Sequence, residues 1–404
     1  MELSFTKEQL SAVITKHAAR ENGLHDLLEI LLESMMIAER GEFLSGEPDN
    51  KGNGYRLGHT YGQGRKLEFR IPRDRYGNFH PKILAILRNQ EQECERLAGV
   101  LYTKGMTGEQ VGDVFEEIYG QHYSKASISR MLDYIRDDVS AWLNRSLESY
   151  YPIVFVDCVH IKIHRKRSVD NEAFYVVLAV KEDKTREGLS IFNRPTESAT
   201  GWGEMLIELR ERGVKRIGLL CADGLKGLDG VLSEVFPSTP LQRCVTHLKR
   251  GMLNKVRHGD KQELADDLRQ VFLTGDKSYT IEKAWERWQQ MCEKWGKDYP
   301  RTIKKMGSDS DYKFYFTYLN YDHRIQSMIY TTNWIERLQK DFRRVTRMRG
   351  AMPNEESVIL LMGKTAMDKR AYERQIPKID LDKNLFPPEN RVLNWDKFPP
   401  MENR

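Results

Sequence analysis

The sequence predicts an α/β protein in which a mixed sheet with flanking helices is combined with all-helical regions. Apolar residues recur at helical spacing over most of the chain, but between Tyr151 and Val245 they form short continuous runs that are typical of buried strands. Three neighbouring strands are expected there, followed by alternating helices and strands. This order is typical of a mixed sheet covered by helices.

The first three strands are expected at Ile153–Ile163, Ala173–Val180 and Gly188–Asn193. The next helix, strand, helix and strand are expected at residues 201–211, 216–221, 227–236 and 240–245. Apolar residues return to helical spacing between Leu248 and Asn320, so a helical block is expected to interrupt the sheet region. A last helix is expected after Thr332, and the stretch from Ile376 is Pro-rich.

Length and composition limit the class of protein. The 404 residues are too many for one hydrophobic core, so two to four domains are expected. A hydrophobic fraction of 40% excludes wholesale disorder, and a net charge of +5 permits a polyanionic partner without requiring one. The sequence contains neither an apolar run of roughly 18 residues nor a signal-peptide core at its start. Because its five cysteines are also scattered, we expect a cytoplasmic protein without a membrane partner.

Two regions are expected before the sheet. Residues 1–64 are predicted to be an N-terminal helical and linker region for DNA binding or dimerisation. Its apolar residues keep helical spacing from Thr6 to Ala38, whereas residues 41–64 are rich in Gly, Asn and charges and are expected to be a mobile connector. Residues 65–148 are predicted to be a helical domain that begins with a short strand near Lys66.

One pair of helices in this domain has the pattern of a helix-turn-helix motif. The first helix is expected from Thr107 to Gly120 and the second from Ser124 to Ile135. In such a motif the second helix enters the major groove of DNA. Its candidate DNA contacts are Lys125, Ser127, Ser129 and Arg130. An ordinary helical hairpin would have the same spacing.

Two aspartates follow apolar strands at positions where a charge is costly to bury. Asp157 follows the run Ile153–Val156, and Asp223 follows Leu219–Ala222 at the carboxyl end of another strand, where ligands of open sheets gather. An ion pair between Asp157 and Lys162 or Arg165 would explain the acid at this position without a functional role. Asp223 before a glycine is also typical of a turn or a helix cap.

A third acid, Glu336, lies at the start of the last predicted helix. It can be explained as part of a capping box with Asn333. However, at about 100° per residue it shares a face with a basic stripe, which would neutralise DNA phosphates. The stripe consists of Lys340, Arg343 and Arg347, and Arg344 extends it.

Carboxylates that meet at one point repel each other unless a divalent cation lies between them. Hard oxygen ligands suit Mg²⁺, for which Mn²⁺ can substitute. Two such ions about 4 Å apart activate a water or a 3′-hydroxyl and stabilise the leaving oxygen of a displacement at phosphorus. We therefore expect a two-ion site at Asp157, Asp223 and Glu336.

Four motifs occur in order along the chain. They are Tyr151-Pro-Ile-Val-Phe-Val-Asp157, Cys221-Ala-Asp223-Gly224-Leu-Lys226-Gly227, Gln242-Arg243-Cys244-Val-Thr-His247 and Thr331-Thr-Asn333-Trp-Ile-Glu336. Together they resemble the motifs of the Mutator-like transposases of bacterial insertion sequences. The resemblance covers about residues 67–367 and is less close at Trp334.

This resemblance implies an RNase H-like catalytic domain with Asp157, Asp223 and Glu336 as its catalytic and metal-binding DDE triad. The domain would span residues 149–248 and 326–375, with an all-helical insertion at 249–325 and a Pro-rich tail at 376–404. The protein would be a homodimer, nucleoid-associated when bound to DNA. It would bind terminal inverted repeats and target DNA, with Lys226 as a further contact. Strand cleavage and 3′-hydroxyl strand transfer would follow, through a circular copy-out intermediate.

The Cys-x-x-His element of the family falls on Cys244 and His247. A zinc site with Cys158, His160 or His164 lacks a closed four-ligand spacing, so a structural motif or a role in positioning DNA is preferred. His247 would either contact the scissile phosphate or be a hydrogen-bonded structural histidine. Two other functions remain open: a non-catalytic DNA-binding regulator derived from a transposase, and an RNase H-like nuclease without strand transfer.

Overall fold

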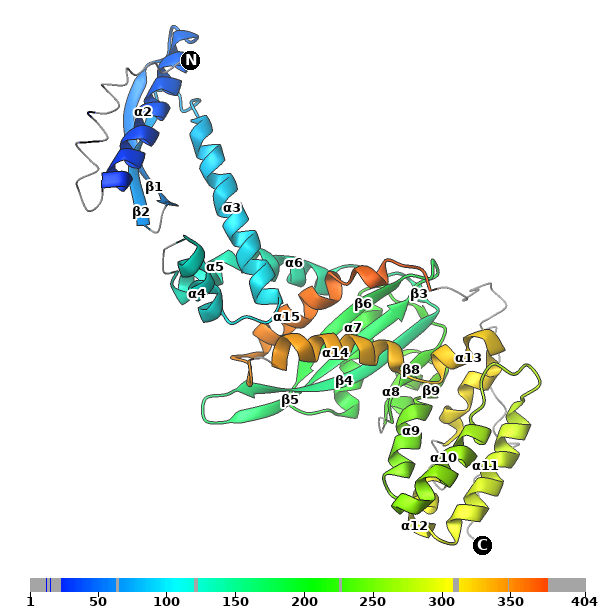
Figure 1. Ribbon diagram of the computed structural model, residues 1–404. Coiled ribbons are helices and arrows are strands. Elements are labelled where there is room, and N and C mark those ends of the chain that lie inside the picture. Colours follow the sequence, from blue (N-terminus) through cyan, green and yellow to red (C-terminus); the bar gives the residue numbers. More distant parts are fainter. Residues whose placement is uncertain are drawn as a thin grey trace. The chain divides into compact units, whose positions relative to one another are not determined.

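The structure of the protein is a computed structural model that describes residues 12, 15, 23–62, 65–119, 123–224, 227–307, 312–347 and 349–376. The chain divides into two compact units, Met1–Ile135 and Arg136–Arg404. Figure 1 shows the helices and strands of both units. Among the helices of the described ranges, none is both long and apolar enough to cross a membrane. Residues 377–404 of the Pro-rich tail and most of residues 6–22 of the first helical stretch lie outside the described residues.

The first unit contains a helix that packs against a β-hairpin (Figure 1). Helix α2 (Gly23–Ser45) covers strands β1 (Gly52–Gly62) and β2 (Arg65–Asp74), which pair antiparallel. Met36 of α2 packs against the inward side chains of β2, which are Leu67, Phe69 and Ile71. The alternating apolar residues of β2 therefore form the small core of this hairpin.

Strand β1 corrects the prediction of a connector over residues 41–64. Its inward positions include Arg56 and Gly58, which pair with Ile71 and Phe69. A Cβ atom at Gly58 would lie 2.4 Å from Ile71 Cδ1, so a larger residue here would require the Ile71 side chain to move. The strand has no apolar alternation in its sequence because its partner supplies the apolar side chains.

The rest of the first unit is helical. Helices α3 (Lys82–Thr103), α4 (Gly108–Tyr119) and α5 (Lys125–Met131) follow the hairpin. The predicted second helix of the helix-turn-helix, Ser124–Ile135, is wrong in its length. Helix α5 ends at Met131, and α6 (Asp133–Asn144) starts a new helix two residues later. Ile128, Leu132 and Ile135 are nevertheless buried on one side, which is why the pattern resembled a single helix.

The second unit contains the predicted mixed sheet of five strands. Its strands are β4 (Ile153–His164), β5 (Val169–Val180), β6 (Arg186–Arg194), β8 (Leu220–Ala222) and β9 (Leu241–Arg243), in the order β6-β5-β4-β8-β9. The first three pair antiparallel, whereas β4, β8 and β9 are parallel. Two short strands, β3 (Tyr150–Tyr151) and β7 (Arg216–Ile217), form a separate parallel pair.

Helices cover both faces of this sheet (Figure 1). Helices α7 (Ala199–Glu211) and α8 (Leu228–Val235) pack on the face that carries Val154 and Val156 of β4. On the opposite face lie α14 (Asn333–Arg347) and α15 (Glu355–Met367). The sequence prediction missed α15 and named α14 as the last helix. The apolar residues of α15 are nearly continuous from Val358 to Met362 and therefore show no helical period.

A helical block lies between β9 and α14, as predicted. Its helices are α9 (Val245–Leu253), α10 (Lys261–Val271), α11 (Ile281–Gly296), α12 (Pro300–Gly307) and α13 (His323–Ile329). Short 3₁₀ turns are η1 (His258–Asp260), η2 (Tyr312–Tyr315) and η3 (Thr317–Asn320), and η4 (Arg370–Tyr372) follows α15. Trp288 packs on Phe272 and Phe316 at the centre of the block. Figure 1 shows the block at the end of the sheet beyond β8 and β9.

The close approach at Gly218 gives a test of the strand that precedes Asp223. The Gly218 amide donates to the Tyr151 carbonyl at 2.9 Å, and an added Cβ would lie 2.5 Å from the Pro152 carbonyl oxygen. We expect Gly218→Ala to lower the free energy of unfolding by about 1–3 kcal/mol, because a backbone atom must move. Urea unfolding followed by far-ultraviolet circular dichroism measures this.

The control is Gly230→Ala in α8, where no atom lies within 4 Å of the added Cβ. We expect this variant to be as stable as the parent chain or more stable by up to about 1 kcal/mol, because alanine favours the helix. Equal unfolding curves for the two variants would contradict the predicted clash.

Candidate functional site

Asp157 and Asp223 lie next to each other at the point where two parallel strands stop pairing. The last pair between β4 and β8 is Val156 with Ala222, so each aspartate is the next residue of its strand. Strand β8 ends there, whereas β4 continues to His164. The space beside β4 is therefore open for side chains at the carboxyl end of β8, which is where open sheets bind ligands.

The pairing of Asp157 with Arg165 is wrong. Arg165 pairs with Glu172 at 2.6 Å and with Glu355 at 2.7 Å. Asp157 instead accepts the Cys158 amide at 2.7 Å and is only 8% exposed. Asp223 similarly accepts the amide of Gly224 at 2.6 Å.

Glu336 reaches this site from the first turn of α14. The helix starts at Asn333, so Asn333 does not precede it as the expected capping residue would. The Thr332 hydroxyl donates to Glu336 Oε1 at 3.5 Å. Trp334 is held by stacking with Arg186 of β6, whose guanidinium lies 4.5 Å from the ring centroid. This contact attaches the start of the helix to the sheet.

His247 lies between two of the acids. Its Nδ1 is 3.3 Å from Asp223 Oδ1, and its Nε2 is 3.8 Å from Glu336 Oε1. A hydrogen bond with Cys244 raises the pKa of His247 to about 9; burial opposes this rise and the nearby carboxylates support it. The imidazole is therefore a cation at neutral pH and balances part of the negative charge of the site.

Asp157 is an acid of this site whose pKa is changed by its surroundings. Burial raises the pKa of Asp157 to about 7. The Cys158 amide and His247 oppose this rise, whereas the charges of Asp223 and Glu336 add to it. The structure thus brings together all three predicted carboxylates and His247. Among the described residues, Glu336 lies within ion-binding reach of Cys244 and His247, whereas Asp157 and Asp223 are not part of that group. Carboxylate oxygens are the ligands that suit Mg²⁺ or Mn²⁺.

Cys244 joins the segments that carry His247 and Glu336. It immediately precedes α9, and the Val245 amide donates to the Tyr330 carbonyl at 2.9 Å. The Thr332 amide donates to Cys244 Sγ at 3.4 Å. Because Thr332 directly precedes α14, these contacts fix that helix relative to α9.

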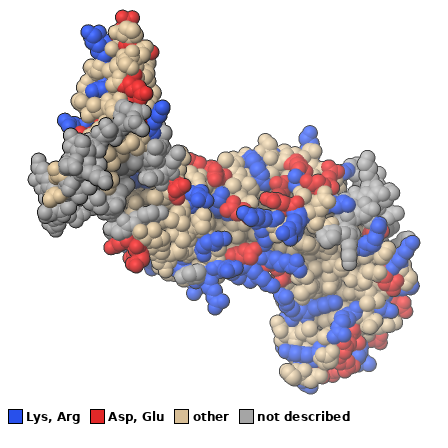
Figure 2. Space-filling model, turned by 45° about the horizontal axis from the view of Figure 1, so that its top comes forward, with Lys and Arg blue, Asp and Glu red and all other residues tan. Residues whose placement is uncertain are grey.

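The basic stripe of α14 faces solvent. Ile335, Leu338 and Phe342 are fully buried against the sheet. The exposed side of the helix carries Lys340, Arg343, Arg344 and Arg347. Figure 2 shows Lys and Arg side chains gathered across one face of the second unit. The helix therefore places an acid at its first turn and cations along its remaining turns.

The DNA contacts predicted for the helix-turn-helix lie on α5. Lys125 and Arg130 are exposed, and Ser127 and Ser129 are half-buried. Lys125 Nζ forms an ion pair with Glu109 at 3.2 Å, which reduces its positive charge toward DNA. Lys226 lies outside the described residues.

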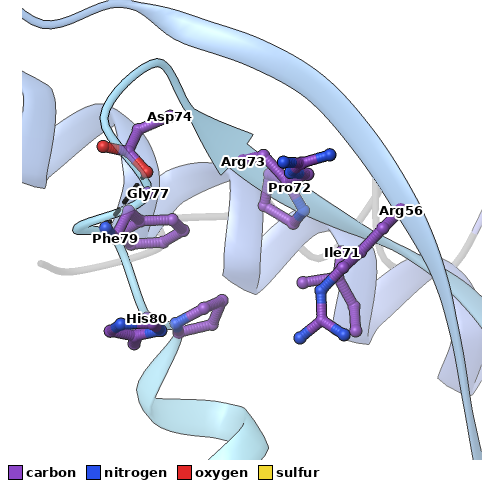
Figure 3. Close-up of a pocket in the computed structure, with 9 residues that line it drawn as sticks. Arg56, Ile71, Pro72, Arg73, Asp74, Gly77, Phe79 and His80 are labelled. Carbon is purple, nitrogen blue, oxygen red and sulfur yellow. Dashed lines mark hydrogen bonds between the residues drawn. The ribbon is translucent and has the colours of Figure 1, made fainter.

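A basic cleft at the β-hairpin was not predicted from the sequence (Figure 3). It has a volume of about 420 Å³ and is lined by Arg56, Ile71, Pro72, Arg73, Asp74, Gly77, Phe79, His80 and Pro81. Asp74 lies at the edge of the cleft, and its carboxylate accepts hydrogen bonds from the Asn50 side chain and from the amides of Asn78 and Phe79. Burial opposes the effect of these bonds, but together they lower the pKa of Asp74 to about 2. Of its lining residues, Arg56 alone falls within the supposed connector, and no motif in the sequence indicated this cleft.

Comparison with known proteins places this arrangement in a class. A family model described as "Transposase, Mutator family" matches residues 2–374. The chain is 33% identical over 344 residues to the transposase for insertion sequence element ISRM3 of Rhizobium meliloti (strain 1021), which covers 84% of this chain and 85% of that protein. It is 27% identical over 363 residues to the transposase for insertion sequence element IS905 of Lactococcus lactis, with 88% and 90% covered.

These relatives define the class as the transposases of insertion sequences. The chain belongs to the Mutator family of transposases. A solved Drosophila P element transposase strand transfer complex is similar over 73% of this chain and 97% of that chain, with 8% identity and a TM-score of 0.40.

The raised pKa of Asp157 predicts how the stability of the metal-free protein depends on pH. A carboxyl group whose pKa is raised by folding stabilises the folded state below its unfolded pKa near 3.8, and this contribution is lost as the pH rises through about 7. An asparagine side chain does not ionise, so we expect Asp157→Asn to gain stability relative to the parent chain as the pH rises between these values. Urea unfolding in EDTA at several pH values measures this difference.

The control is Glu234→Gln, which removes an exposed carboxylate from α8. We expect it to follow the parent chain at every pH. If Asp157→Asn also follows the parent chain throughout, then burial does not hold Asp157 in its protonated form.

Proposed function

We propose that this chain is a DDE transposase that cleaves the ends of an insertion sequence and joins the 3′-hydroxyl ends to target DNA. The observation that supports the proposal is that Asp223 and Glu336 lie on either side of His247, and that the charges of both acids act on Asp157. The sheet and α14 would form an RNase H-like catalytic domain from residues 149–248 and 326–375. Residues 249–325 would be its helical insertion.

Asp157, Asp223 and Glu336 would hold two Mg²⁺ ions. When bound, such ions activate a water or a 3′-hydroxyl and stabilise the leaving oxygen at phosphorus. Asp157 is the least exposed of the three acids, so it has the greatest need of a cation. His247 is protonated between the other two acids and is placed to contact a phosphate that approaches them.

DNA would reach these acids along the stripe of α14, where Lys340, Arg343, Arg344 and Arg347 neutralise its backbone. Helices α4 and α5 would recognise terminal inverted repeats, with Lys125, Ser127 and Arg130 as contacts. Because an element has two ends to be cleaved, we propose that the chain acts as a homodimer. We also propose a circular copy-out intermediate.

The chemical test uses labelled element-end DNA with Mg²⁺ or Mn²⁺. We expect Asp157→Asn to abolish both cleavage and joining while leaving DNA affinity within about threefold of the parent chain, because the change removes a ligand but no DNA contact. Electrophoresis separates the products, and fluorescence anisotropy measures binding.

The other outcomes distinguish the alternative functions. Unchanged cleavage by Asp157→Asn would remove this residue from the site. Nicks without joined products from the parent chain would identify a nuclease, and DNA binding without any cleavage would identify a regulator. The control is Glu234→Gln, which is expected to cleave and join normally.

The stripe of α14 gives a separate prediction. We expect the double variant Arg343→Ala, Arg347→Ala to bind all DNA sequences more weakly, and the slope of log affinity against log salt to fall by up to about two phosphate contacts. The matched control removes Arg210 and Lys215, which are exposed on and after α7 on the opposite face of the sheet. An unchanged slope in the stripe variant would mean that this face of α14 does not contact DNA.

A further inference from the structure

A second group of metal-binding side chains lies behind the carboxylate site. Cys158, His160 and Glu197 each offer one ligand atom, and these atoms all lie within 4.8 Å of one another. Cys158 and His160 are two residues apart on β4, so they project from the same face of the sheet. Asp157 projects from the opposite face. The two groups are therefore separated by the strand itself.

The backbone around Glu197 is held in place by one tyrosine. Tyr175 pairs with Cys158 across β4 and β5. Its hydroxyl accepts the Ser198 amide at 2.8 Å and donates to the Thr196 carbonyl at 3.2 Å. Thr196 and Ser198, which flank Glu197, are therefore both hydrogen-bonded to Tyr175, the residue that pairs with Cys158.

Two further contacts make this loop rigid. Ser198 caps α7 by accepting the Gly201 amide at 3.1 Å. The Tyr175 ring packs edge-on against Trp202 with centroids 4.5 Å apart. A Cβ atom at Gly201 would lie 2.4 Å from the Tyr175 hydroxyl, so glycine is needed for this approach. Glu197 is therefore presented to Cys158 by a fixed turn.

The ligand types of Cys158, His160 and Glu197 indicate which metal ion they would bind. A thiolate, an imidazole and a carboxylate together suit Zn²⁺, whereas Mg²⁺ prefers oxygen ligands alone. In a tetrahedral zinc site, the sulfur and nitrogen ligands are about 3.6 Å apart, given metal–ligand distances of about 2.3 and 2.0 Å. The ligand atoms of Cys158, His160 and Glu197 lie within 4.8 Å of one another, so a bound ion would draw them closer together. His160 is exposed, so a water can complete the coordination.

We propose that Cys158, His160 and Glu197 form a zinc site that attaches β4 to the turn before α7. This site is separate from the carboxylate group that includes Asp157 and does not depend on the proposed transposase chemistry. The ion would cross-link two strands on either side of β5, because Glu197 follows β6. It would thereby fix the part of β4 that carries Asp157 on its other face.

Cobalt is a spectroscopic probe for this site, because Co²⁺ bound to a thiolate has a charge-transfer absorption band. The full-length, reduced and metal-free chain is titrated with CoCl₂ in excess Mg²⁺, which occupies oxygen-only sites. We expect the band to appear with one equivalent of Co²⁺ and to disappear when Zn²⁺ is added. Cys158→Ser is expected to lose the band, and the exposed His160→Ala to weaken Co²⁺ binding at least about tenfold.

Two control variants separate this site from the neighbouring group of Cys244, His247 and Glu336, whose ligand atoms also lie within 4.8 Å of one another. Cys244→Ser and Asp157→Asn are expected to keep the band. A band lost in Cys244→Ser but kept in Cys158→Ser would overturn the proposal and place the metal in the carboxylate site. Absence of the band in the parent chain would also overturn it. Circular dichroism checks the fold of each variant, and His160→Ala tests the site at a position that folding does not depend on.

Discussion

The mutual repulsion of three carboxylates is the constraint on which the second unit depends. Burial raises the pKa of Asp157, and the nearby charges of Asp223 and Glu336 raise it further. His247 supplies a positive charge between the other two acids. A protein gains nothing in stability from such a cluster, since burying like charges is unfavourable. A cation held at the proposed metal site would offset this repulsion.

The surrounding structure holds these acids together by connections between distant parts of the chain. Parallel pairing of β4 and β8 sets the two aspartates side by side. Cys244 accepts the amide of Thr332, and Arg186 stacks on Trp334, so α14 is attached at its start to both α9 and β6. Trp334, where the resemblance to the family motif is less close, thus has a structural role, because Arg186 of β6 packs on its ring. The two residues of the Cys244 and His247 motif have different roles. Cys244 fixes the start of α14, and His247 supplies a positive charge beside Asp223 and Glu336.

Strand β4 carries different chemistry on its two faces. Its odd-numbered residue Asp157 points to the face covered by α14, whereas Cys158 and His160 point to the face covered by α7. A hard oxygen site and a softer site with sulfur and nitrogen can therefore occupy adjacent residues without competing for one ion. The fixed turn at Glu197 gives the second face a ligand from outside the strand.

The sequence by itself determined the elements whose apolar period is local: the five-stranded sheet, the helical block and the buried side of α14. The charged residues at Asp157, Asp223 and Glu336 were identifiable because a charge next to an apolar run is unusual. Only the tertiary structure decided which residues meet. Strand β1 has no apolar alternation because β2 fills its inner face, α15 has no period because it is buried, and Glu197 joins Cys158 only through the pairing of β4 with β5. Such contacts depend on residues far apart in the chain, and local spacing does not record them.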